Sequence, residues 1–175
     1  MGTQRVHAGL DIQVRRWGIA LAVSLLALAV STSARADITK KVQSKFKGQI
    51  IITEEPLPEV GDAKQGIAVV KKLNQSSVKG DEIEGVMSWT FYYTAFLKKP
   101  PKTSDLTLDF HTADKENLYV ANNRLQVNGN INIIEGRITI TEDDGPSRNR
   151  TYNLILRAKK GAKEIEVAKT KINLK

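Results

Sequence analysis

The chain contains few side chains that could carry out nucleophilic or acid–base chemistry. It has no cysteine and two histidines, and His7 lies in an N-terminal segment that we expect to be removed. His111 then remains alone at the start of a polar stretch. The lack of cysteine excludes a thiol nucleophile, and the single histidine excludes a multi-histidine zinc site. A serine–histidine–aspartate arrangement would need His111, and neither G-x-S-x-G nor G-x-G-x-x-G occurs. We therefore predict a protein that is not an enzyme and that uses no cofactor.

Carboxylates are the remaining candidates for a metal site or for hydrolysis. Glu142 to Asp144 precede Gly145 and Pro146 in a long polar loop, where oxygen ligands in a turn could hold Ca²⁺. These acids are contiguous rather than alternating, and Arg148 and Arg150 would compete for their charge. We therefore predict no metal site. A hydrolase built from two loop acids is a less favoured alternative, because the sequence does not indicate which two acids would meet.

Aromatic side chains form the other candidate site. Tyr92 and Phe96 share one face of a predicted strand over 86–97, and Tyr119 lies in a short strand further along the chain. An exposed row of aromatic rings on a sheet is suited to stacking on sugar rings or to contact with an apolar partner. The alternative is that these rings form a second packing layer beneath the segment 62–74.

The strand over 86–97 shows the clearest alternation in the sequence. Its apolar face should lie in the core, because successive side chains of a strand point to opposite sides of the sheet. That face comprises Met87, Trp89, Phe91, Tyr93, Ala95 and Leu97. Further strands are predicted at 49–53, at 105–110 and through most of 131–174. The segment 62–74 remains open between a short helix, which Asp62 and Asn74 could cap, and a strand, which Ile67 and its β-branched neighbours favour.

In the second half of the chain, turn residues and a change in the apolar alternation predict where strands end or are interrupted. Asn122-Asn123 indicates a turn, and Asn128-Gly129-Asn130 is typical of a β-hairpin because these residues tolerate positive φ. After the turn at 159–162, Ile165 and Val167 occupy odd positions whereas Ile172 and Leu174 occupy even ones, so we predict a β-bulge within 168–171.

The number and spacing of these elements predict the fold class. About seven to nine short antiparallel strands, with turns every eight to twelve residues, are typical of an all-β sandwich. Trp89 in a central strand and Tyr152 at the start of the penultimate strand indicate an immunoglobulin-like layout, although the inter-sheet cysteines of antibody domains are missing. We expect a single immunoglobulin-like β-sandwich over 37–175, with 37–47 a partly mobile lysine-rich segment and one possible short helix near 62–74.

The first thirty-six residues have the three parts of a secretory signal peptide. Arg15 and Arg16 precede an apolar run from Trp17 to Val30, and a small, polar stretch ends in Ala34-Arg35-Ala36. A charged region, an apolar region and an A-x-A site in that order predict cleavage after Ala36. We therefore expect residues 37–175 to be periplasmic or secreted, without a membrane-spanning segment after cleavage.

Composition then limits the partners. The formal net charge is +8, and the loss of four arginines and one aspartate with the first thirty-six residues leaves a mildly basic chain. Interspersed signs argue against a nucleic-acid partner. Lysines gather near the last predicted hairpin, where they resist edge aggregation or contact an anionic surface. We predict an exported binding or protein-interaction module of a bacterial envelope, with an unknown protein or glycan partner. The alternative is carbohydrate or envelope-polymer binding through the aromatic face.

Overall fold

The computed structural model describes residues 40–60 and 62–175. The predicted signal peptide, 1–36, lies outside the described residues. Two α-helices, α1 (Lys40–Phe46) and α2 (Ala63–Leu73), and a 3₁₀-helix, η1 (Glu142–Asp144), accompany the strands. The strands are β1 (Gln49–Thr53), β2 (Ser77–Val78), β3 (Asp81–Ile83), β4 (Val86–Phe96), β5 (Asp105–Thr112), β6 (Tyr119–Gln126), β7 (Ile133–Thr141), β8 (Arg150–Lys160) and β9 (Lys163–Leu174).

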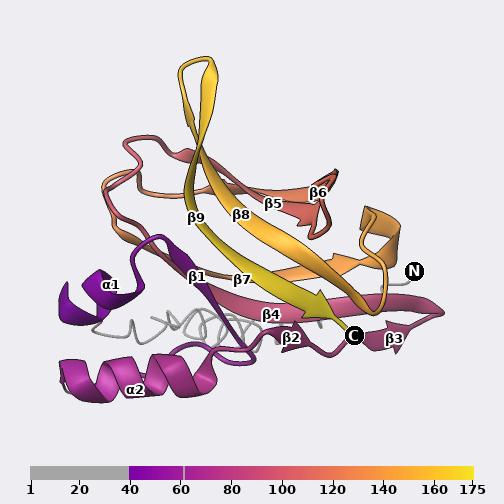
Figure 1. Ribbon diagram of the computed structural model, residues 1–175, viewed down its shortest axis with the longest axis horizontal. Helices are drawn as coiled ribbons and strands as arrows, with labels where there is room; N and C mark the ends of the chain where they lie inside the picture. Colours follow the sequence, from indigo (N-terminus) through magenta and orange to yellow (C-terminus); the bar gives the residue numbers. More distant parts are fainter. Residues whose placement is uncertain (1–39, 61) are drawn as a thin grey trace, which may run out of the picture. The chain divides into compact units, whose positions relative to one another are not determined.

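All of these strands belong to one hydrogen-bonded sheet. Its order is β3-β4-β1-β9-β8-β5-β6, with β7 along the other edge of β4 and β2 beside β9, and the sheet curls into a half-barrel (Figure 1). The prediction of a mostly β protein is therefore confirmed. The immunoglobulin-like sandwich of antiparallel strands is not confirmed, because β1 joins β9 in parallel at Gln49 and Lys169 and so unites both halves in one mixed sheet.

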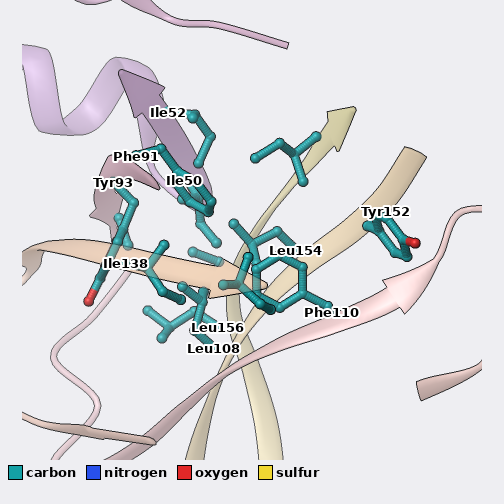
Figure 2. Packing of buried hydrophobic residues seen from close by; sticks show 14 of the residues in the cluster. Ile50, Ile52, Phe91, Tyr93, Leu108, Phe110, Ile138, Tyr152, Leu154 and Leu156 are labelled. Atoms are coloured by element: carbon teal, nitrogen blue, oxygen red, sulfur yellow. The ribbon is translucent and has the colours of Figure 1, made fainter. Parts of the chain in front are cut away.

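The concave side of the sheet holds the main core. The apolar face predicted for the strand over 86–97 is buried at every position from Met87 to Leu97. Figure 2 shows side chains of β1 and β4, such as Ile50 and Phe91, on one side of this core and Leu154 and Phe110 from β8 and β5 on another. The rings of Phe110 and Tyr152 meet edge to face, with their centroids 6.5 Å apart. The curl of the sheet thus lets one face supply a continuous core.

The segment 62–74 is helical. The carboxylate of Asp62 caps α2 by accepting hydrogen bonds from the backbone amides of Lys64 and Gln65, at 2.7 and 2.9 Å. This cap satisfies orphan amides of the first turn. The helix period also places Ile67 against the sheet, where it packs with a second apolar cluster. Capping and packing therefore outweigh the strand preference of the β-branched residues.

This second cluster covers the convex side of β1 and β4. It contains Val42, Phe46, Ile51, Leu57, Val70 and Phe96, contributed by both helices, two strands and a loop. Most of the segment 37–47 accordingly forms α1, with Val42 and Phe46 buried. Helix α2 approaches α1 closely at Gly66, where a Cβ atom would lie 2.8 Å from Cγ2 of Val42.

Two turn predictions in the middle of the chain are wrong. Residues 122 and 123 lie within β6, and Asn128-Gly129 does not join a hairpin, because β6 pairs with β5 whereas β7 pairs with β4. The segment instead crosses from one part of the sheet to another. Gly129 lies against the backbone of Thr103, and its carbonyl accepts a hydrogen bond from Lys102 N at 2.9 Å. Because Gly129 has no side chain, the two loops can approach each other closely at this point.

The predicted bulge is present, one residue before the expected range 168–171. The register between β8 and β9 shifts between Leu156 and Arg157, which leaves Val167 as the extra residue of β9. The extra residue shifts the alternation by one position. Ile165 before the bulge and Ile172 after it therefore point to the same face of the sheet, as the sequence pattern required.

The Tyr93 hydroxyl should make stability sensitive to alkaline pH. Burial raises the pKa of Tyr93 to about 12, from 10 in the unfolded chain. Folding therefore favours the neutral phenol, and its contribution is complete below pH 10 and lost as the pH rises toward 12. We expect the protein to lose roughly 2 kcal/mol more unfolding free energy over this interval than the variant Tyr93→Phe. Urea unfolding of both proteins at pH 9 to 12 measures the difference, and parallel pH profiles would contradict it.

Candidate binding site on the outer face of the sheet

The three aromatic residues predicted as one face are separated in the structure. Phe96 is fully buried, and its ring lies 5.6 Å from that of Phe46 in α1. Tyr92 is half-buried, with the Arg137 guanidinium 5.9 Å from its ring centroid. Tyr119 is 57% exposed and belongs to β6, away from β4 in the sheet order. The second packing layer therefore accounts for Phe96, and only Tyr119 remains as a well-exposed aromatic ring of this set.

Tyr119 borders a polar depression on the convex side of β5, β6 and β8. The depression has a volume of about 190 Å³. The side chains alternate along each strand, so the outward positions of β5 meet the outward positions of its neighbours. The lining comprises Thr107, Asp109, His111, Tyr119, Asn122, Arg157 and Glu164. Five of these seven residues come from the paired strands β5 and β6, which hold them in a fixed register.

The floor of this depression contains an ion pair. Arg157 Nε lies 2.8 Å from Asp109 Oδ2, and Asp109 is only 5% exposed. The pair exists because β5 and β8 align Thr107 with Arg157, which places the guanidinium diagonally across from Asp109. A charge-assisted hydrogen bond in a partly desolvated position is stronger than an exposed pair. The pair therefore presents a rigid donor and acceptor surface to the depression.

His111 adds a hydrogen-bonding atom that has no partner. Its Nδ1 lies 3.0 Å from the Asn117 carbonyl oxygen. Because a carbonyl oxygen can only accept, Nδ1 carries the hydrogen and Nε2 of the neutral ring is an acceptor. Among the described residues nothing bonds to Nε2, although it is buried. The Tyr119 ring stands edge-on to the imidazole, at 5.8 Å between centroids.

The turn between β5 and β6 fixes the position of His111. Asp114 Oδ1 accepts hydrogen bonds from Thr112 Oγ1 at 2.6 Å and from the Asn117 amide at 3.1 Å. The bond from Thr112, together with the backbone amides, lowers the pKa of Asp114. Asn153 Nδ2 donates to Asn117 Oδ1 at 3.0 Å from β8. The carbonyl that orients His111 is therefore held from two sides.

The acidic run 142–144, considered and rejected as a calcium site from its sequence, has structural partners. Asp144 Oδ2 accepts hydrogen bonds from the amide and the hydroxyl of Thr141, at 2.8 and 2.9 Å. Glu142 Oε1 accepts a bond from the Arg148 amide at 3.3 Å. These carboxylates cap η1 and its loop. In the part of the chain that the structure describes, no group of three or more histidines and acids is placed to hold a metal ion.

Sequence reasoning missed the central pair of this site. The alternation of Leu106, Leu108 and Phe110 with polar residues assigns Asp109 to the outward face of its strand, but no sequence signal connects it with Arg157. Within the described residues, neither helix is long and apolar enough to cross a membrane.

No protein-family model matches the chain, and comparisons with the curated proteins and with the solved structures give no significant match.

Proposed function

We propose that the chain is an exported, non-enzymatic binding module whose ligand site is the depression around Asp109, His111, Tyr119 and Arg157. One observation carries this proposal: an ion pair between a buried carboxylate and a partly buried guanidinium lines the same depression as an exposed aromatic ring. A purely structural ion pair would not need the Tyr119 ring in solvent, nor a buried His111 Nε2 without a partner. Groups that remain unpaired in a formed cavity are suited to a ligand.

The lining indicates a hydroxyl-rich ligand, and we favour a carbohydrate. Tyr119 offers a flat ring for stacking, Asp109 offers an acceptor and Arg157 offers donors. Pockets for drug-sized ligands measure about 300–1,000 Å³. The volume of about 190 Å³ is smaller, so we expect one sugar ring or the end of a polymer chain to occupy it.

Hydrolysis at the same site is less well supported. Asp109 and Glu164 both line the depression, as a pair of catalytic carboxylates would. The Asp109 carboxylate is engaged with Arg157 at 2.8 Å, so it is less available to act on a substrate. This engagement favours binding over catalysis.

A binding screen tests the proposal. The full chain is applied to an array of bacterial saccharides, and the strongest binder is titrated by calorimetry. We expect Tyr119→Ala to weaken that binding about tenfold, because aromatic stacking contributes up to about 1.5 kcal/mol. Tyr92→Ala is the matched control, since Tyr92 lies on β4 beside Arg137, and it should bind like the wild type. Failure of every saccharide to bind, or equal losses in both variants, would contradict the proposal.

A further inference from the structure

The hairpin between β8 and β9 projects beyond the rest of the sheet (Figure 1). Its turn contains Gly161, whose φ of 62° lies in the left-handed region, followed by the exposed Ala162. The strands that flank this turn pair Lys160 directly with Lys163 and Ala158 with Ile165. Directly opposed residues of an antiparallel pair lie on the same face, and so do alternate residues of a strand. Both lysines therefore share one face with Ile165.

This arrangement does not stabilise the fold. Like charges that face each other across two strands repel, which lowers the stability of a hairpin. Neither Lys160 nor Lys163 has an ion-pair partner among the described residues. The nearby acids do not share this face: Glu164 lies opposite Lys159 and Glu166 opposite Arg157, on the other side of the sheet, and Glu166 bonds Lys169 at 2.9 Å. An anionic partner would remove the repulsion.

The same face also exposes an aliphatic side chain. Ile165 is 41% exposed, whereas Ala158 opposite it is fully buried at the margin of the core. Two flexible ammonium groups next to an exposed isoleucine match the interface of a membrane. There, lysines contact anionic headgroups while apolar side chains enter the acyl boundary. A soluble polyanion would use the lysines but would gain little from Ile165.

We propose that the tip of this hairpin, formed by Lys160, Lys163 and Ile165, is a contact site for an anionic lipid surface. This site is separate from the polar depression, which lies on the opposite face of the sheet. The two lysines attract the headgroups, and Ile165 adds a small apolar contact. Because two lysines give a modest affinity, the contact is reversible.

A reporter at the tip tests this proposal in the full chain. The sequence contains no cysteine, so Ala162→Cys introduces a single site for an environment-sensitive dye. We expect a blue shift of its emission with phosphatidylglycerol vesicles and none with phosphatidylcholine vesicles. The control is the same dye on Ala68→Cys, an exposed position of α2, which should not respond. This local readout distinguishes hairpin contact from binding by any other segment.

Charge variants then identify the residues. Adding Lys160→Gln and Lys163→Gln to the labelled protein should lower its affinity for the vesicles about 30-fold. Each lysine near such a surface contributes about 1 kcal/mol to the binding free energy. Lys71→Gln with Lys72→Gln on α2 removes the same charge and should change nothing. An unaltered response of the hairpin variant would overturn the proposal. So would a response to soluble polyphosphate without one to vesicles, which would assign the tip to free polyanions.

Discussion

Replacing Asp109 with alanine is expected to lower the free energy of unfolding by about 3 kcal/mol, because it leaves a half-buried guanidinium without its charged partner. The Arg157 side chain is only 27% exposed, so water cannot fully replace the lost carboxylate. The same change should abolish ligand binding at the depression. Urea unfolding gives the stability difference, and calorimetry with the strongest saccharide gives the affinity.

A second ion pair of the same sheet supplies the control. Arg124 and Asp105 lie 3.9 Å apart, with side chains 74% and 37% exposed. Exposed pairs contribute about 0–1 kcal/mol, so Asp105→Ala should have little effect. A double-mutant cycle on Asp109 and Arg157 isolates their coupling. If Asp109→Ala costs no more than Asp105→Ala, the pair does not organise the depression.

Gly129→Ala should be the most disruptive alanine substitution in the loops. A Cβ atom there would lie 2.5 Å from the carbonyl oxygen and 2.7 Å from the amide nitrogen of Thr103. These are backbone atoms, which can move only if the loop moves. The hydrogen bond from Lys102 N to the Gly129 carbonyl would then be lost as well. We expect a loss of about 3 kcal/mol, at the upper end of overpacking effects, measurable by thermal or urea unfolding.

Gly66→Ala provides the contrast. Its Cβ would meet side-chain methyl groups, Cγ2 of Val42 at 2.8 Å and Cγ2 of Val60 at 3.0 Å. Alanine gains about 1 kcal/mol over glycine inside a helix, which offsets much of this crowding. We expect a net change within about 1 kcal/mol. Equal effects of the two substitutions would show that the approach of Gly129 to Thr103 is not rigid.

Local patterns predicted the elements of the fold better than their partners. The alternation in 86–97 placed Trp89 and its neighbours in the core, because periodicity reports directly which face is buried. It did not reveal that Phe96, on the other face, is covered by two helices, because a second apolar layer and a partly solvated face look alike in sequence. The Asn128-Gly129 turn was likewise a local signal, and the pairing of β6 and β7 with other strands decided its role.

The candidate site shows the same limit. His111 and Tyr119 were visible in the sequence as single residues of a suitable type. Asp109 and Arg157 meet only because β5 pairs with β8, a contact between strands that are far apart in the sequence. Sequence patterns fix the face on which each side chain lies, but the register between such distant strands depends on the whole core. The ion pair therefore had no signature of its own.

The pairing of β1 with β9 has a consequence for how the chain folds. These strands lie in the middle of the sheet, yet one comes early and the other late in synthesis. Contacts between such distant segments form slowly, and domains rich in them have a high contact order. The central sheet cannot close before the ribosome has released β9. During translation the two halves of the sheet therefore remain separate, and the edges of β1 and β8 stay without their β9 partner until this last strand emerges.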